Sequence, residues 1–226
     1  MGNFQKLPPS LYRGSLLRRA LFSFGEKMKY SLILPAHNAA EYIRKGVESV
    51  RAQVYKDYEL IVVCDACEDN TADIAREYTD IVDVVDFANP GLARSRGLDL
   101  ATGEWILFMD DDDWWLHEFA FKMIDEHVSH NIDLLCYGFI WKGRGYAAPI
   151  RDNGSLWPAV WNKAWRRTAI GDTRFPSDYP DDYLFAVEMG KKPLRMSFYN
   201  MPLYYYNYWR PGSISYQCEA DLRKYK

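Results

Sequence analysis

The chain has 226 residues, of which 48% are hydrophobic, and a formal net charge of −3 at pH 7. This length and apolar content suffice for one hydrophobic core, and no apolar stretch approaches the ~20 residues needed to cross a bilayer. The first residues lack the apolar segment of a signal peptide, and the four cysteines are too few for a small disulfide-rich secreted domain. We therefore expect a cytoplasmic protein with free thiols.

Charge is distributed unevenly along the chain. Residues 1–29 carry six basic and one acidic side chain, residues 191–226 carry seven basic and two acidic ones, and the acidic excess lies between them. An acidic body with basic ends suits an enzyme that holds a cation together with a polyanionic ligand, or one that rests on an anionic surface. The pattern leaves open a peripheral contact with the inner face of a membrane, and nucleic acid as a partner.

Residues 1–28 form an extension whose composition differs from that of the remaining chain. The segment 11–24 places several leucines near one side of a helix, with Arg18 and Arg19 away from that side. We expect a basic amphipathic helix, which either packs on its own domain or lies on a membrane surface.

From residue 30 onward, strand and helix patterns alternate. We expect strands at 30–34, 60–63, 81–85 and 105–109, and helices at 41–53, 71–78 and 91–100. This alternation predicts an α/β fold with a Rossmann-like, mainly parallel sheet and helices on both faces.

Polar residues come directly after three of these strands. Pro35, His37 and Asn38 come after the first, Asp65 after the second, and a run of aspartates after the fourth. Ligands of parallel sheets bind beyond the carboxyl ends of the strands. The sequence therefore predicts a binding site at that edge.

The aspartate run, Asp110 to Asp113, comes directly after the apolar strand 105–109 and before Trp114 and Trp115. Neighbouring like charges raise one another's pKa, and burial beside two indoles adds a desolvation cost. A cation relieves both effects, and Mg²⁺ or Mn²⁺ usually binds one or two carboxylates plus substrate phosphates. The alternative is a solvated acidic turn.

These segments resemble the nucleotide-sugar domain of family 2 glycosyltransferases. The similar segments are Leu32-Ile33-Leu34-Pro35-Ala36-His37-Asn38, residues 53–63, Ala93-Arg94-Ser95-Arg96-Gly97 and residues 103–114, with looser matches at 160–163, 181–185 and 212–215. The resemblance implies a GT-A fold, a divalent metal, a nucleoside diphosphate sugar donor and inversion at the anomeric carbon. It also implies a single domain at 29–226, divided into a nucleotide-sugar half (29–115) and an acceptor half with a basic tail (116–226).

The resemblance also implies roles for individual residues on the donor side. Asp110-Asp111-Asp112 matches the family's DxD motif, in which Asp112 would ligate Mn²⁺ or Mg²⁺ and Asp110 would face the ribose and metal waters. Asp65 would lie against the base, normally uracil, whose imide N–H a carboxylate can accept. Arg94 is a candidate donor contact, with helix capping or a surface ion pair as the alternative.

One motif departs from the family pattern. Cys64-Asp65-Ala66-Cys67 stands where Asp-Asp-Gly-Ser is common, so another nucleoside could replace uridine. The Cys-x-x-Cys spacing also fits zinc or redox chemistry, but no second cysteine pair accompanies it and tetrahedral zinc needs four ligands. We expect His37 to pack or hydrogen-bond near the nucleoside rather than to catalyse.

The acceptor half is predicted to contain a helix at 116–130, a strand at 132–141, a flexible loop at 143–154 and a helix at 183–189. Asp181-Asp182 occupies the position of the family's Glu-Asp pair, whose second member is the general base, so the resemblance assigns Asp182 this role and Asp181 an orienting one. Capping of the adjoining helix is the alternative for both.

The aromatic stripe from Tyr204 to Trp209 fits either sugar stacking or packing, and we favour packing. Arg210 lies within reach of a diphosphate in this prediction.

The resulting hypothesis is an inverting, metal-dependent glycosyltransferase. It would move a sugar from a UDP-sugar to a hydroxyl of a glycan, a lipid-linked or another acceptor, in glycan or polysaccharide synthesis. Two alternatives are a catalytically silent nucleotide-sugar binding protein and a sugar nucleotidyltransferase, whose glycine-rich loop is missing after the first strand.

Overall fold

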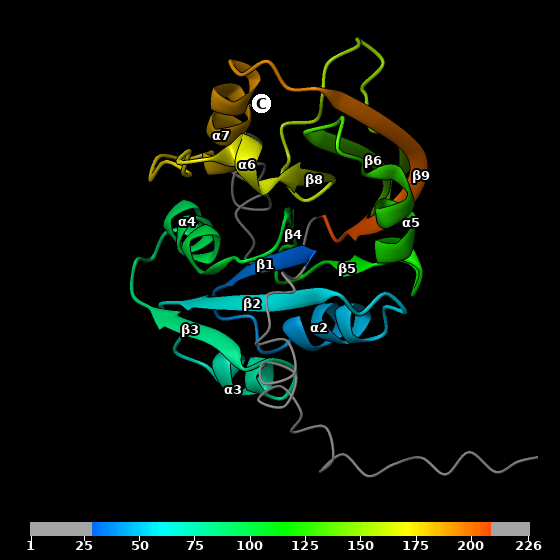
Figure 1. Cartoon of the computed structure of the whole chain (residues 1–226). Coiled ribbons are helices and arrows are strands. Elements are labelled where there is room, and N and C mark those ends of the chain that lie inside the picture. Colours follow the sequence, from blue (N-terminus) through cyan, green and yellow to red (C-terminus); the bar gives the residue numbers. More distant parts are fainter. Residues whose placement is uncertain (1–28, 209–226) are drawn as a thin grey trace, which may run out of the picture.

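One sheet runs through residues 29–208, the part of the chain that the computed structural model describes (Figure 1). Its strands are β1 (Tyr30–Ala36), β2 (Tyr58–Asp65), β3 (Ile81–Val85), β4 (Trp105–Phe108), β5 (Trp114–Trp115), β6 (Leu134–Trp141), β7 (Gly145–Ala147), β8 (Lys163–Arg166) and β9 (Met196–Tyr206). The helices are α2 (Ile43–Arg51), α3 (Thr71–Arg76), α4 (Pro90–Leu100), α5 (Ala120–His127), α6 (Arg167–Ile170) and α7 (Asp181–Gly190). The helix predicted at 11–24, Arg210 and the match at 212–215 lie outside the described residues.

The strand order is β3-β2-β1-β4-β8-β6-β9-β5, with β7 paired to β6. The first four strands are parallel, as predicted. Strand β8 is antiparallel to both β4 and β6, so β6 has the direction of β4, and β9 is parallel to β6. The carboxyl ends of β1, β2, β3, β4, β6 and β9 therefore share one edge of the sheet, called here the carboxyl edge.

Apolar side chains on both faces of the central strands explain the two helical layers. Leu32 and Leu34 of β1 belong to one buried cluster, which also contains residues of α2, α3 and α5. Ile33, on the other face of β1, belongs to a second cluster with residues of α4, α6 and α7. Each fully buried aliphatic side chain contributes roughly 1.5–3 kcal/mol. The prediction of helices on both faces is confirmed.

The boundaries after residue 115 differ from the predicted ones. Helix α5 is shorter than the predicted 116–130, because the Leu116 N–H pairs with the Leu203 carbonyl (3.0 Å) and Val128 is extended. The predicted loop at 143–154 contains β7, which pairs with β6 through Ile140 and Tyr146. The longest helix among residues 29–208 has 11 residues, and none of these helices has the length and apolar character of a membrane span.

Three cysteines lie among the described residues, and all three are free thiols, as expected. Cys64 is buried at the end of β2 and Cys67 is half-buried in the adjoining turn. A hydrogen bond from the Cys64 thiol lowers the pKa of Cys67 to about 6, against the opposing effect of burial.

Candidate active site

The loops after β1, β2 and β4 meet at the carboxyl edge. The His37 N–H donates to Asp111 Oδ2 (3.0 Å), and its ring Nδ1 lies 2.7 Å from the Asp65 carbonyl oxygen. Asn38 lies beside His37 in a left-handed conformation (φ 46°) and accepts the Glu68 N–H at 2.8 Å. The structure thus brings together predicted site residues from three separate strand ends.

Pro35 is placed differently from the prediction. It lies buried inside β1, in register with Val63 of β2, because β1 continues to Ala36 instead of ending at Leu34. Its side chain therefore belongs to the sheet, and the loop that can contact a ligand begins at His37.

Asp65 holds the loop before α4. Its Oδ1 accepts the N–H groups of Phe87 (2.6 Å) and Ala88 (2.9 Å), and its Oδ2 accepts that of Asn89 (2.7 Å). A carboxylate has about four acceptor positions, so three are already used. A contact between Asp65 and a nucleoside would have to use the remaining acceptor position.

Residues 110–113, called here the aspartate turn, place four carboxylates in four different surroundings. Asp110 contacts Arg94, Asp111 contacts His37, and Asp112 is half-buried. Asp113 is 1% exposed, and its oxygens accept the Tyr204 hydroxyl and the Asn207 N–H, both at 2.7 Å.

The aspartate turn fits a divalent cation shared with a ligand. Burial, and then the charges of Asp112 and Asp110, raise the pKa of Asp113 well above its ordinary value, which shows how closely the negative charges lie. Among residues 29–208 no group of three His, Cys, Asp or Glu side chains forms a metal cage. Hard carboxylate oxygens are nevertheless ligands for ions such as Mg²⁺, which bind one or two carboxylates plus phosphates.

Arg94 joins the aspartate turn to the predicted catalytic pair. From α4, its Nη2 donates to Asp110 Oδ1 (2.7 Å) and its Nη1 donates to Asp181 Oδ2 (2.5 Å). The arginine side chain is only 9% exposed and that of Asp181 7%, so the triad is centred on a buried pair, with Asp110, 27% exposed, as its outer member. Arg94 does form ion pairs, but the alternative of a surface pair is wrong, because its guanidinium group is buried.

Two glycines permit this close assembly. A Cβ on Gly91, in the first turn of α4, would lie 2.3 Å from the Pro176 carbonyl oxygen and 2.9 Å from Asp181 Cβ. A Cβ on Gly46, in α2, would lie 2.8 Å from the Asp113 carbonyl oxygen. Real Cβ contacts are longer than either distance, so α4 reaches Asp181, and α2 reaches the aspartate turn, only with glycine there.

Asp182 lies beside the triad at the start of α7. Burial raises the pKa of its carboxyl group, with Arg94 opposing the shift and Asp181 adding to it. Its Oδ1 accepts the Tyr183 N–H at 2.7 Å. A carboxylate with a raised pKa is a better proton acceptor than an ordinary aspartate.

Two side chains at or near the site were not singled out as site residues from the sequence. The Tyr204 hydroxyl accepts the Asp110 N–H (3.1 Å) and donates to Asp113. Lys163 is buried and donates to the carbonyls of Trp157 and Ala159. Burial lowers the pKa of Lys163 to about 8, although Cys136 and Asp182 oppose this. A lysine amid apolar residues after Trp161 is the sequence signal that could have revealed it.

Comparisons with known proteins identify the family and the relatives of this chain. The profile of the family described as glycosyl transferase family 2 matches residues 31–179. EpsH of Bacillus subtilis is 27% identical over 213 residues, covering 78% of this chain and 60% of EpsH. The Staphylococcus aureus poly(ribitol-phosphate) beta-N-acetylglucosaminyltransferase TarS is 28% identical over 210 residues, covering 82% of this chain and 36% of TarS.

Solved structures show the same architecture. The crystal structure of TarS residues 1–349 with UDP has a TM-score of 0.67 and 26% identity, covering 79% of this chain and 60% of that one. Mycobacterium tuberculosis glucosyl-3-phosphoglycerate synthase with Mg²⁺ and UDP has a TM-score of 0.63 at 19% identity and covers 99% of this chain, which supports the fold alone.

The fold is that of a GT-A domain. The chain belongs to glycosyl transferase family 2. It spans about three-fifths of the length of EpsH and a smaller share of TarS.

Proposed function

We propose that this protein transfers a sugar from a nucleoside diphosphate sugar, with UDP as the carrier, to an acceptor hydroxyl with inversion. The observation that carries the proposal is the triad, in which Arg94 holds Asp110 of the aspartate turn and Asp181 of the predicted catalytic pair at 2.7 and 2.5 Å. Arg94 thereby fixes Asp110, on the proposed donor side, relative to Asp181, the neighbour of the proposed base Asp182.

Each side chain of the site has a separate task. Asp112 and Asp110 would hold Mn²⁺ or Mg²⁺, which when bound supplies charge neutralisation for the leaving diphosphate. Asp182 takes the proton from the acceptor hydroxyl, and its raised pKa suits that task. Arg94 and Asp181 hold the aspartate turn and Asp182 in fixed positions relative to each other. His37 and Asn38 lie where the nucleoside would contact the loop after β1.

UDP is supported by the TarS structures with UDP and UDP-GlcNAc, to which this chain is 26% identical. Asp65 contributes one remaining acceptor position, which an imide N–H of uracil can use and cytosine cannot. Cys64 and Ala66 flank Asp65 where the family commonly has aspartate and glycine. Measuring which nucleoside the protein prefers therefore tests the assignment of Asp65 directly.

The experiment is thermal unfolding with UDP and CDP, each in Mn²⁺ or in chelator. UDP with Mn²⁺ at about 100 times its dissociation constant should stabilise the fold by about 2.7 kcal/mol, which corresponds to roughly 5–10 °C. CDP should shift the midpoint less, and chelator should remove most of the UDP effect. Asp112→Asn should lose the metal-dependent part of the shift, while the exposed Asp178, changed to Asn, should keep it.

Hydrolysis of a UDP-sugar, or its transfer, then separates an enzyme from a silent binding protein. Strong stabilisation by UDP with no hydrolysis and no transfer to any glycan would support the silent binder. Equal shifts by UDP and CDP would contradict the role of Asp65, and an undiminished UDP shift in chelator would contradict the metal.

A further inference from the structure

A set of aromatic side chains extends outward from the aspartate turn along the carboxyl edge. Trp161 stacks on Tyr204 (4.9 Å between ring centroids) and on Tyr206 (4.7 Å), and Tyr204 contacts Asp113. We call the outer part of this set the aromatic shelf; it consists of Trp141, Trp157, Tyr206 and Tyr208. Trp141 contacts Trp157, Tyr206 and Tyr208 at 5.4, 5.9 and 5.2 Å. All four shelf residues are half-buried, so part of each side chain reaches the surface.

The direction of the strands explains why the shelf lies near the site. Trp141 ends β6 and Tyr206 ends β9, and both strands run parallel to β4, which leads into the aspartate turn. The shelf therefore occupies the same edge of the sheet as the proposed donor site, on the side of the acceptor half.

Two arginines cover the shelf. The guanidinium carbon of Arg144 lies 4.3 Å from the Trp141 ring centroid and 5.3 Å from that of Tyr208. That of Arg151 lies 4.4 Å from the Trp157 centroid. An arginine that stacks on an aromatic ring keeps its N–H edge available for a planar anion.

The side chains of these two arginines have neither a carboxylate nor a carbonyl partner among residues 29–208, whereas Arg51 and Arg167, which also form no ion pair there, donate to the carbonyls of Tyr78 and Gly103. Neither Arg144 nor Arg151 forms an ion pair with a carboxylate of residues 29–208. Seven other arginines do, namely Arg44, Arg76, Arg94, Arg96, Arg166, Arg174 and Arg195. In a protein with an acidic body, two cations without acidic partners at the active edge indicate that an external anion belongs there.

Unsatisfied hydrogen-bond donors lie at the same place. The Trp141 Nε1 and the Arg151 Nε atoms are buried, and neither has a hydrogen-bond partner among the described residues. A buried donor without an acceptor destabilises the fold, and a ligand oxygen that reaches it when the covering side chains move would remove this cost.

Further positive charge lies beside Tyr205, which points to the opposite face of β9 from Tyr204 and Tyr206. Lys45 is 3.0 Å from the Trp114 ring centroid, and Trp114 stacks on Tyr205 at 4.0 Å. Burial and the charge of Lys142 lower the pKa of Lys45, so the two ammonium groups lie close enough to repel each other. Lys142 itself comes after Trp141, and its N–H donates to the Tyr206 carbonyl. This repulsion, like the unpaired arginines, is relieved by an anion.

We propose that the aromatic shelf, with Arg144 and Arg151, is the acceptor subsite, and that the acceptor is an acidic saccharide carrying phosphate or carboxylate groups. The inference rests on the proposed function and specifies its substrate class. Sugar C–H faces pack on the aromatic rings, while the two guanidinium groups bind the anions in bidentate fashion. A neutral glycan can accept hydrogen bonds from these donors, but it carries no negative charge to balance the two guanidinium groups.

The test measures saccharide binding in the absence of donor, by calorimetry, with three probes of matched length. These are a polyol-phosphate oligomer, a uronic acid oligosaccharide and a neutral oligosaccharide. The wild type should bind one acidic probe at least about tenfold more tightly than the neutral one, and added salt should weaken this binding. The acidic probe that binds more tightly identifies the anion as phosphate or carboxylate.

Arg144→Gln and Arg151→Gln should each weaken binding of the preferred acidic probe about tenfold or more and leave UDP affinity in Mn²⁺ unchanged. The matched control is Arg51→Gln, which removes the same charge from an exposed arginine whose partner is the Tyr78 carbonyl; it should bind every probe as the wild type does. Arg144→Lys keeps the positive charge but loses the planar pair of N–H donors. Its affinity for the acidic probe should therefore lie between those of the wild type and Arg144→Gln.

Three results would overturn the proposal. These are equal affinity for neutral and acidic probes, unchanged acidic binding in both glutamine variants, and loss of UDP affinity in those variants, which would assign the arginines to the donor diphosphate. Failure of the proposed function looks different, because the wild type would then bind no UDP whatever it does with saccharides.

Discussion

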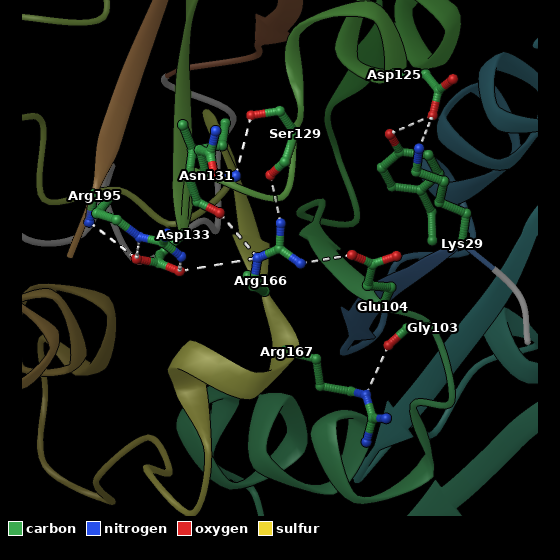
Figure 2. A network of polar contacts seen from close by, with 12 residues as sticks. Lys29, Gly103, Glu104, Asp125, Ser129, Asn131, Asp133, Arg166, Arg167 and Arg195 are labelled. Carbon is green, nitrogen blue, oxygen red and sulfur yellow. Dashed lines mark hydrogen bonds and ion pairs between the residues drawn. The ribbon is translucent and has the colours of Figure 1, made fainter.

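The two edges of the sheet use charged residues in opposite ways. At the amino edge, where the parallel strands begin, every cation drawn in Figure 2 has a protein partner: Arg166 donates to Glu104 (2.6 Å), Arg195 to Asp133 (2.8 Å) and Lys29 to Asp125 (2.7 Å), while Arg167 donates to the Gly103 carbonyl. At the carboxyl edge, acidic groups gather at the aspartate turn, and the guanidinium groups of Arg144 and Arg151 lie over aromatic rings instead of carboxylates of the described residues.

This difference distinguishes charged residues that stabilise the fold from charged residues that we propose to bind ligands. Strands β4, β6 and β9 begin directly after Glu104, Asp133 and Arg195, respectively. The ion pairs of these residues therefore fix where the three strands begin. At the carboxyl edge, negative charge gathers at the aspartate turn and positive charge at the aromatic shelf, and the proposed cation and anionic ligands would balance them. Arg94 is the exception that joins both uses, because it is paired with two carboxylates and yet lies between the proposed donor and base groups.

The largest expected effect is that of Asp182→Asn. Removal of the proton acceptor should lower the transfer rate about 10²- to 10⁴-fold with donor affinity nearly unchanged. Because the pKa of Asp182 is raised, the wild-type rate should fall with acid at a higher pH than for an ordinary aspartate, and the variant should lack this limb. Single-turnover rates across pH measure both.

The control for this prediction is Asp178→Asn, which changes an exposed acidic residue shortly before α7. It should keep the wild-type rate and pH profile. A normal transfer rate in Asp182→Asn would show that Asp182 is not the base and only caps helix α7.

The next effect in size concerns the triad. Arg94→Gln leaves the carboxylates of Asp110 and Asp181 facing each other without a buried cation. Breaking a buried pair in this way costs about 3–5 kcal/mol, or roughly 10 °C in the unfolding midpoint. Denaturant unfolding measures the loss, and Mn²⁺ should restore part of it if the aspartate turn binds the ion. A variant as stable as the wild type would contradict the triad.

The smallest effect is expected at the amino edge. Hydrogen bonds from Arg195 lower the pKa of Asp133 to about 2, so the pair stabilises the fold above the unfolded pKa of about 4 and is lost as pH falls through about 2. Asp133→Asn should cost about 1 kcal/mol at pH 7, since Arg195 is half exposed to solvent. Unfolding curves of the variant and wild type should converge toward pH 2, and donor affinity should be equal at pH 7.

The sequence predicted the sheet better than the site. Alternation of strand and helix located β1 to β4 and α2 to α4 within about two residues, because each segment carries its own apolar pattern. Strand β5 has two residues and β7 three, which is too short for any pattern to be visible.

The site was predicted as a set of residues but not as a set of contacts. Four consecutive aspartates look alike in sequence, yet Asp110 takes its partner from 16 residues earlier and Asp113 from 91 residues later. The Arg94–Asp181 contact joins residues 87 apart. Such pairings are set by the strand order, which local patterns do not contain. Packing was the favoured interpretation of the aromatic stripe, and it is confirmed for the buried Tyr204.

The position of β9 has a consequence for how the protein folds. Both hydrogen-bond partners of Asp113 lie at the end of this strand, 91 and 94 residues further along the chain, and β9 inserts between β5 and β6. Contacts of such separation form late, because the entropy of closing the chain is lost before the contact is gained. An intermediate with β1 to β4 assembled would resemble a nucleotide-binding sheet and still hold Asp113 without its partners. The appearance of donor binding during refolding would therefore mark the arrival of the last strand.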